Sequence, residues 1–465
     1  MTELFKVLQI YVMPILTDSK NFIENEFSNL NFGDKRLNRR ILEVAASLNS
    51  TPSLSIPAMT DGDDGQLKAI YRFFQNGKVC DQKVLQTHYL NTLQRIQSYN
   101  GKILLIADST FVSPTKHFKG LMSRGKGKEN CLRTHYCLAV TEDGKNVLGI
   151  LDFNVFSDPI TKRYPRLRNE SDIWIFSMEN CLNLIQSLPS SDKVLSRCIF
   201  IADREADEFE LMLFLRENNL SFIIRSQYDR KIVFEKTESK LNEIENSAKI
   251  HGAAYVVKTR VDKEVVDVKV RRCVLRNVLI TPPPAVKDRT ADLIVNVVVV
   301  KEVDGQEHSI KWRLLTCESV DNTDESSATV LFYSQRWIIE EVNKAAKTGV
   351  RVEERQFTEL EHFVPFLAMA FVVAWRMVAL RTVTEVSPTT SIEQAFTADE
   401  VGYMKAQAKG FELPMKNVSD AIYFIGRLGG FTGRYKNPGW QILWQGWMKF
   451  YERVAGYIVA KSEFS

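Results

Sequence analysis

Two short apolar runs that end in the same tripeptide constrain the fold of this chain more than any other feature. Residues 102–107 and 197–202 are almost wholly apolar, and each ends in Ile-Ala before an aspartate, Asp108 or Asp203. Apolar runs of this length predict buried strands. Further strands are expected at 135–140, 147–153 and 221–225, with a turn at Asp143-Gly144 and helices at 172–188 and 203–218. Buried strands that alternate with helices predict an α/β domain.

The 465 residues suggest two to four domains. Residues 1–80 have helical periodicity, and 81–380 contain the α/β pattern. Within the latter, about 230–320 are rich in Val and Thr with alternating polarity, which predicts an antiparallel β insert. Residues 381–465 are expected to form a helical, aromatic-rich domain.

Composition excludes several classes of protein. The seven cysteines form no Cys-x-x-Cys pair, which favours reduced packing residues over a zinc site or a disulfide framework. The apolar run 363–375 is too short to span a bilayer and predicts a buried helix. Glu3 and Lys6 make the start a poor signal peptide. We therefore expect a cytoplasmic or nucleoid-associated protein. The net charge of +4 permits a nucleic-acid partner but does not indicate one.

One polar stripe stands out between residues 333 and 347. Read as a single helix, this segment places Tyr333, Arg336, Glu340 and Lys347 on one side, opposite an apolar face. A carboxylate between cations and a phenol suits a metal ion beside a phosphodiester. The alternative is a solvated face of an amphipathic helix.

Three carboxylates are candidates for one site: Asp108, Asp203 and Glu340. Strand ends can gather distant residues at one sheet edge, and converging carboxylates suit Mg²⁺. Two such ions can stabilise the attacking and the leaving oxygen of a phosphodiester displacement. Each aspartate could instead cap a turn or a helix. Three competing carboxylates remain, namely Glu341, Asp207 and Glu208.

Residues 34–48 predict an amphipathic helix whose first turns are basic. Arg36, Arg39 and Arg40 lie there, next to Lys35. Such a helix fits the DNA backbone. It could equally be an ordinary solubilising surface.

The order of these motifs resembles a known family. Asp108, then Asp203-Arg-Glu-Ala-Asp207, then Tyr-x-x-Arg-x-x-x-Glu-x-x-x-x-x-x-Lys over 333–347 is similar to bacterial cut-and-paste DDE transposases of the insertion-sequence-four group. Short motifs at 33–34, 69–73, 311–316 and 427–447 extend the resemblance over most of the chain.

The resemblance implies an RNase H-like catalytic core with the β insert, flanked by an N-terminal domain that binds DNA ends and a C-terminal dimerisation domain. It implies that Asp108, Asp203 and Glu340 bind metal, with two Mg²⁺ ions expected and Mn²⁺ as a substitute. It assigns phosphate contacts to Tyr333, Arg336 and Lys347. The same resemblance implies that Trp312 stacks on a base flipped out of the duplex and that Arg225 contacts the DNA backbone.

The activity implied is a DNA transposase, which is both a metal-dependent nuclease and a strand transferase. It would excise an element through a DNA hairpin and join its 3′-OH ends to target DNA. Its partners would be double-stranded transposon ends, target DNA and a second copy of the chain, without a membrane. The location would be the bacterial cytoplasm and nucleoid.

Overall fold

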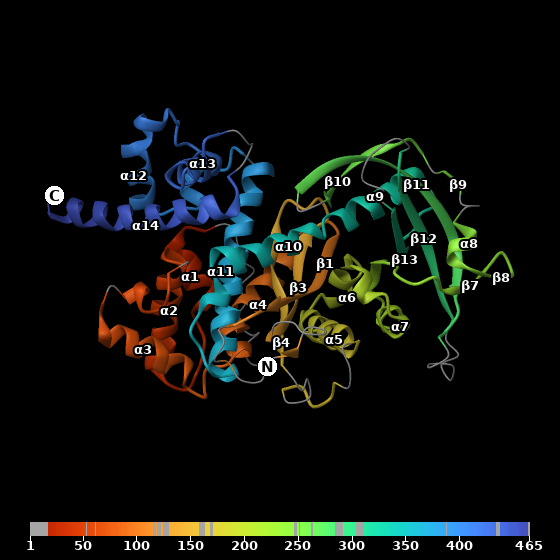
Figure 1. Cartoon of the computed structure of the whole chain (residues 1–465), viewed down its shortest axis with the longest axis horizontal. Coiled ribbons are helices and arrows are strands. Elements are labelled where there is room, and N and C mark those ends of the chain that lie inside the picture. Colours follow the sequence, from red (N-terminus) through yellow and green to blue (C-terminus); the bar gives the residue numbers. More distant parts are fainter. Residues whose placement is uncertain are drawn as a thin grey trace.

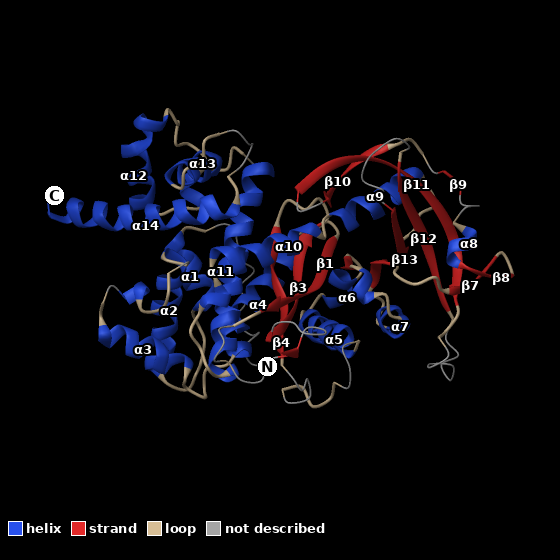
Figure 2. Ribbon diagram, viewed as in Figure 1, coloured by secondary structure: helices blue, strands red, loops and turns tan. Residues whose placement is uncertain are grey.

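The structure is a computed structural model. It describes residues 17–52, 54–60, 62–114, 118, 122–123, 130–157, 163–167, 171–245, 249–250, 252–261, 264–283, 292–303, 311–386, 388–433 and 438–463. A mixed sheet runs through its middle, with helical regions at one end and a strand-rich lobe at the other (Figures 1 and 2).

Five strands form the core of this sheet in the order β4-β3-β1-β5-β6. β3 pairs antiparallel with both β1 and β4, whereas β1, β5 and β6 are mutually parallel. This order makes the core RNase H-like, as expected. The bounds are β1 Ile103–Val112, β2 Met122–Ser123, β3 Asn130–Thr141, β4 Val147–Phe156, β5 Cys198–Ala202 and β6 Ser221–Arg225.

Helices cover both faces of the core sheet. Alternate residues of β1 belong to two hydrophobic cores. Leu104 and Ile106 pack on the side of α11, and Ile103 and Leu105 pack on the side of α5. The helices that connect the core strands are α5 Asp172–Gln186, α6 Ser191–Leu195 and α7 Phe209–Glu217.

The insert is antiparallel, as predicted, and it continues the core sheet. β13 pairs with β6, so the sheet extends outward through β12 and β11 to β7 and β8. β10 and β9 also pair with β11. The bounds are β7 Lys231–Phe234, β8 Thr237–Lys240, α8 Leu241–Ile244, β9 Lys249–Ile250, β10 Tyr255–Val261, β11 Glu264–Ile280, β12 Leu293–Glu302 and β13 Lys311–Thr316.

The long helix α11 is the axis of the helical part. It spans Leu360–Val386, so it is twice as long as the apolar run at 363–375. By length and composition, residues 360–384 could cross a membrane, but their most apolar window is completely buried in the protein. The buried helix predicted from the sequence is confirmed, and it extends beyond the apolar run at both ends.

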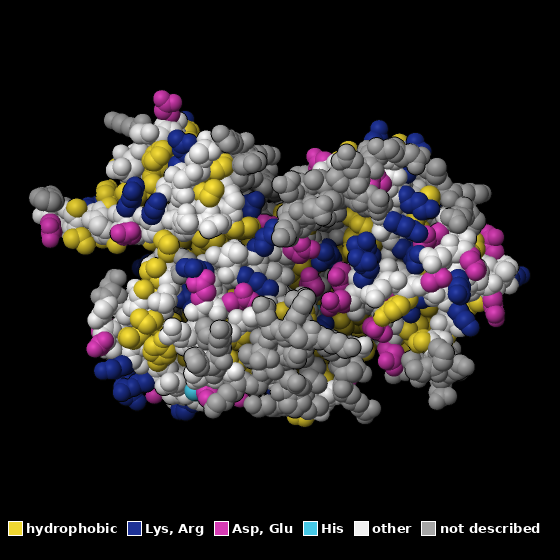
Figure 3. All heavy atoms as spheres, in the orientation of Figure 1, with side chains coloured by type: hydrophobic (Ala, Val, Ile, Leu, Met, Phe, Trp, Pro, Cys, Tyr) yellow, Lys and Arg dark blue, Asp and Glu magenta, His cyan; other side chains and the backbone are white. Residues whose placement is uncertain are grey.

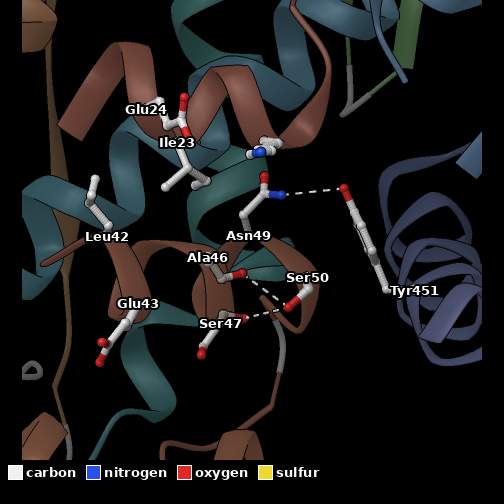
Figure 4. A pocket seen from close by; sticks show the side chains of 10 residues that line it. Ile23, Glu24, Leu42, Glu43, Ala46, Ser47, Asn49, Ser50 and Tyr451 are labelled. Carbon is white, nitrogen blue, oxygen red and sulfur yellow. Dashed lines mark hydrogen bonds between the residues drawn. The ribbon is translucent and has the colours of Figure 1, made fainter. Parts of the chain in front are cut away.

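The N-terminal and C-terminal helices flank α11 (Figure 1). α14 contacts α2 where Asn49 Nδ2 donates to the Tyr451 hydroxyl at 3.3 Å, beside a groove of about 560 Å³ between α1, α2 and α14 (Figure 4). The bounds are α1 Ser19–Phe27, α2 Lys35–Ser50, α3 Asp64–Phe74, α4 Asp81–Ser98, α9 Thr323–Ser334, α10 Trp337–Lys344, α12 Ala398–Gln407, α13 Val418–Leu428 and α14 Trp440–Glu463.

The seven cysteines are all free thiols, and five of them are buried. Their predicted role as reduced packing residues is confirmed.

Candidate active site

Asp108 lies inside β1 rather than after it. The strand continues to Val112 because residues 109–112 still pair with β3, so the predicted strand end at residue 107 is wrong. The parallel pairing of β1 with β5 ends where Ile106 is opposite Ile201. Two residues further along each strand, the same register brings Asp108 beside Asp203.

Asp203 directly follows β5, as predicted. Its side chain also caps the short 3₁₀ helix Arg204–Ala206, because Oδ1 accepts a hydrogen bond from the Glu205 backbone N–H at 2.9 Å. The capping alternative and the sheet-edge placement are therefore both realised by one residue.

The segment 333–347 is not one continuous helix. α9 ends at Ser334, a turn follows, and α10 leads into a π-helical turn at Ala345–Gly349. Arg336 keeps helical backbone angles, φ −53° and ψ −28°, at the start of α10. The stripe therefore retains nearly helical spacing although the helix itself is interrupted. Single-turn π-helices are frequent at functional sites.

Arg336 joins two of the three candidate carboxylates. Its Nη1 lies 3.2 Å from Asp108 Oδ2, and its Nη2 lies 2.5 Å from Glu340 Oε1. All three side chains are less than about a third exposed. The guanidinium also feels the charge of Asp203. One cation is thus shared by three carboxylates from β1, the end of β5 and α10.

This sharing leaves the site rich in negative charge. Burial raises the pKa of Asp108 to about 7, with a further upward push from Asp203, although the Arg336 charge acts to lower it. Burial alone would lower the pKa of the Arg336 guanidinium, but Tyr333 and the carboxylates raise it instead. The site therefore favours additional positive charge.

The donor chemistry suits a divalent cation, because carboxylate oxygens are the ligands that Mg²⁺ prefers. The present arrangement is centred on Arg336, however. Among the described residues no three His, Cys, Asp or Glu side chains are grouped closely enough to hold a metal. The Arg336 guanidinium lies between Asp108 and Glu340 in this arrangement.

Glu341 and Asp207 have other partners. The Glu341 carboxylate contacts Arg381 of α11 and Trp440 of α14, and it also pairs with Lys344 of its own helix α10. Asp207 is buried and anchors the start of the insert. Its Oδ2 accepts the backbone N–H groups of residues 227 and 228, at 2.7 and 3.0 Å. Glu208 forms a side-chain hydrogen bond with Ser171.

The phenol and the aromatic ring predicted to contact DNA lie against each other. The rings of Trp312 and Tyr333 are 5.2 Å apart in an edge-on arrangement, and both side chains are buried. Arg225 is hydrogen-bonded to Tyr333 and donates to the Lys311 carbonyl oxygen at 3.2 Å. Lys347 is half-buried within the π-helical turn.

Sequence reasoning missed a layer of residues behind the aspartates. Arg133 of β3 donates from Nε to Ser109 Oγ at 3.0 Å and pairs with Glu205 at 3.2 Å. It therefore ties the residue after Asp108 to the turn after Asp203. The available signal was Arg133 itself, a charged residue beside an apolar strand, because such residues are seldom buried without a partner.

Tyr136 supports α10 from the sheet. Its hydroxyl lies 3.0 Å from the Ile339 carbonyl oxygen and 2.8 Å from Asn343 Oδ1, and either oxygen can accept its hydrogen bond. Burial raises its pKa well above the usual value, with smaller contributions from Asp108 and Glu340.

The predicted basic helix is α2, and its apolar face is buried as expected. Arg36 and Arg39 are exposed, while Arg40 is partly covered. These arginines do not join the carboxylate site. Residues 124–128, a further basic stretch, lie outside the described residues. Lys and Arg side chains are also prominent over the insert, with acidic side chains between them and α10 (Figure 3).

The strand order and the converging carboxylates define an RNase H-like protein with an acidic centre. A family model described as transposase DNA-binding matches residues 19–79, and one described as transposase DDE domain matches residues 99–376. The second match covers more than half of the chain, so the chain belongs to the family of transposases with a DDE domain.

One solved structure among those similar to this chain is a cryo-EM structure of the piggyBac transposase synaptic complex with hairpin DNA. The identity is 9%, the match covers 95% of this chain and 85% of that chain, and the TM-score is 0.44.

Proposed function

We propose that the chain is a cut-and-paste DNA transposase of the insertion-sequence-four group, similar to the transposon-five transposase. It binds the ends of an element, excises the element through a DNA hairpin and joins the 3′-OH ends to target DNA. The observation that carries this proposal is the convergence of Asp108, Asp203 and Glu340 on one guanidinium, in a chain that belongs to the DDE family.

Divalent metals are the general cofactors of DDE transposase domains. Asp108, Asp203 and Glu340 would hold them, with two Mg²⁺ ions proposed and Mn²⁺ as a substitute. Such ions stabilise developing charge on the attacking and leaving oxygens. Arg336, once released from two carboxylates, is placed to hold a phosphate, as a guanidinium fork suits phosphate geometry. Lys347 and Tyr333 would supply further phosphate contacts.

Every proposed step is an in-line displacement at phosphorus. Water first breaks a P–O bond at the transposon end and releases a 3′-OH. That hydroxyl attacks the opposite strand to form the hairpin, a second water opens it, and the regenerated 3′-OH attacks target DNA. Each step forms one P–O bond and breaks another, so one site serves them all.

Trp312 is proposed to stack on a base flipped out near the hairpin. Its position beside Tyr333 and next to the exposed Lys311 supports a place near the DNA. Since the ring is buried against Tyr333, stacking requires local opening. We expect Trp312→Ala to impair hairpin formation more than first-strand nicking. Equal loss of both would assign the ring to packing.

A second copy of the chain is proposed as partner, so that each subunit cuts the end bound by the other. The aromatic residues of α14 pack within the chain, with Trp440, Trp444, Trp447 and Phe450 buried. The outer part of the helix carries the exposed Ile458 and Val459, which makes it the better candidate for contact with the second copy. The proposed location remains the bacterial cytoplasm and nucleoid.

The deciding experiment supplies uncut and pre-cut end DNA, taken from sequences that flank the gene, with plasmid target and Mg²⁺. Joined products support the transposase. Cutting without joining indicates a nuclease, and tight binding with neither reaction indicates a DNA-binding regulator.

A further inference from the structure

The C-terminal helix α14 contacts α10, the helix that carries Glu340. Glu341 Oε2 accepts hydrogen bonds from Trp440 Nε1 at 2.5 Å and from Arg381 Nη1 at 3.0 Å. The Arg381 guanidinium also lies 4.7 Å from the centre of the Trp440 ring. Glu341, Arg381 and Trp440 therefore form a closed triangle between α10, α11 and α14, one residue away from Glu340.

A second contact lies one turn further along α14 and eight residues after Glu341. Trp444 packs onto Gly349, the last residue of the π-helical turn. A Cβ added at Gly349 would lie 1.8 Å from two atoms of the indole ring. Trp444 is buried, so this contact is a fixed part of the fold. α14 thus touches the end of the segment that contains Lys347, as well as the start that contains Glu340.

The opposite side of the same segment rests on the core sheet. Tyr136 of β3 contacts the Ile339 carbonyl oxygen and Asn343, and Arg336 reaches Asp108 on β1. The segment 336–349 is therefore held between β1 and β3 on one side and α14 on the other. A turn separates the segment from α9, and the π-helical turn ends it.

We propose that Trp440 is a positioning residue for the catalytic centre. Through Glu341 it fixes the rotation of α10, and this rotation sets where the Glu340 carboxylate lies relative to Asp108 and Asp203. The inference rests on the proposed function for its effect on DNA cleavage. The mechanical part, that α14 orders α10, is independent of any activity.

The test compares two substitutions on the same helix. Trp440→Phe removes the N–H donor to Glu341 and keeps an aromatic ring beside Arg381. Trp447→Phe is the matched control. Trp447 is also buried, and its Nε1 donates to the backbone oxygen of Asn49 on α2 at 3.3 Å rather than to a residue of α10. Both variants lose one buried indole hydrogen bond from α14.

The first measurement is single-turnover cleavage of end DNA that is already bound. We expect Trp440→Phe to cut about 10- to 100-fold more slowly, since small misplacements of catalytic groups have effects of that size. The Kd for end DNA and the unfolding temperature should stay close to those of Trp447→Phe. Equal rates for the two variants, whether both slow or both normal, would overturn the proposal.

The second measurement needs no DNA. Amide hydrogen exchange across α10 should accelerate in Trp440→Phe and remain unchanged in Trp447→Phe, because local opening becomes easier where a contact is lost. If the wild-type chain cuts no DNA, the proposed function fails, while this exchange experiment still decides whether α14 orders α10. Unchanged exchange in Trp440→Phe contradicts the inference.

Should Trp440→Phe fail to fold, Arg381→Met tests the same triangle. Its side chain is partly exposed, so the loss is better tolerated. The same slow cleavage and the same faster exchange in α10 are expected, and their absence again contradicts the proposal.

Discussion

Two clusters of charge, on helices that each contact α11, follow different rules. At the candidate active site, the single guanidinium of Arg336 serves Asp108, Glu340 and the nearby Asp203. In the N-terminal part, the single carboxylate of Glu26 on α1 is served by two partners on α4, Arg95 and His88. In the first cluster the carboxylates outnumber the guanidinium that they share, whereas in the second each charge has a partner.

The Glu26 cluster also shows how its histidine is arranged. The Ile150 backbone N–H donates to His88 Nε2 at 2.9 Å, which assigns the ring proton to Nδ1, where it donates to Glu26 Oε2 at 2.6 Å. Burial lowers the pKa of His88, consistent with a neutral ring. Every charge in this cluster has a partner, as structural charges in a protein interior require.

Unbalanced charge marks the place where an external cation or phosphate is expected. A buried surplus costs stability and persists where function requires it.

The largest effect is expected for Glu340→Gln. Removing one carboxylate charge at the centre of the site should reduce cleavage by at least about 10³-fold, the upper range for loss of one electrostatic contact in an active site. Single-turnover cleavage of end DNA measures the rate. Binding of end DNA, measured by gel shift, should remain close to that of the wild type.

Glu341→Gln is the adjacent comparison for that experiment. Because Glu341 acts through its contacts with α11 and α14, this variant should keep measurable cleavage at a reduced rate. If Glu341→Gln abolished cleavage and Glu340→Gln did not, the assignment of the two neighbouring glutamates would be reversed.

The next effect concerns stability. Glu26→Ala leaves Arg95 buried without its carboxylate, and we expect the free energy of unfolding to fall by about 3–5 kcal/mol. Urea denaturation at pH 7 measures this loss. Glu24→Ala, an exposed glutamate on the same helix, should change stability by less than about 0.5 kcal/mol.

The stability lost in Glu26→Ala depends on pH in a defined direction. Burial acts to raise the pKa of Glu26, but Arg95 and His88 outweigh it, so the folded-state pKa lies below the usual value of 4.5. The stabilisation is therefore present above pH 4.5 and is lost as the pH falls through the folded-state pKa. The difference between wild type and Glu26→Ala should shrink in that range, and a difference that grows on acidification contradicts the neutralised cluster.

A smaller effect is expected for Arg133→Lys. A lysine cannot reproduce the guanidinium fork with which Arg133 reaches both Ser109 and Glu205. The segments that carry Asp108 and Asp203 therefore lose part of their support. Single-turnover cleavage should slow by about 10-fold with unchanged end binding. Arg163→Lys, at an ion pair with Asp81 remote from the carboxylates, should leave the rate unchanged.

The sequence predicted what depends on local pattern. The strands around Asp203, the insert and the apolar face of α2 follow from periodicity of two or 3.6 residues, and these agree with the structure. It did not predict that β1 runs past Asp108, because that extension depends on pairing with β3, a partner chosen by tertiary structure. The break before α10 and the roles of Arg133 and Tyr136 were missed for the same reason.

The site was predicted as a set of residues and not as an arrangement. The spacing of Arg336 and Glu340 on one stripe already implied their contact, which is an i, i+4 ion pair. That Arg336 also reaches Asp108, 228 residues away, depends on how α10 packs on the sheet. The preference for Glu340 over Glu341 came from the polar stripe itself, and the partners of Glu341 on α11 and α14 are what the stripe did not indicate.

The smallest effect is expected on α2, where the imbalance of charge has the opposite sign. Arg39 and Arg40 share one carboxylate, Glu43, and Arg36 is highly exposed, so this surface has surplus positive charge for DNA phosphates. Replacing Arg36 and Arg39 by Gln should weaken end binding, and the slope of log Kd against log salt should fall by about one unit for each lost contact. Glu43→Gln is the opposite change, since it releases both arginines, and it should tighten binding. Weaker binding by Glu43→Gln would show that α2 is a neutral surface helix whose ion pairs serve folding alone.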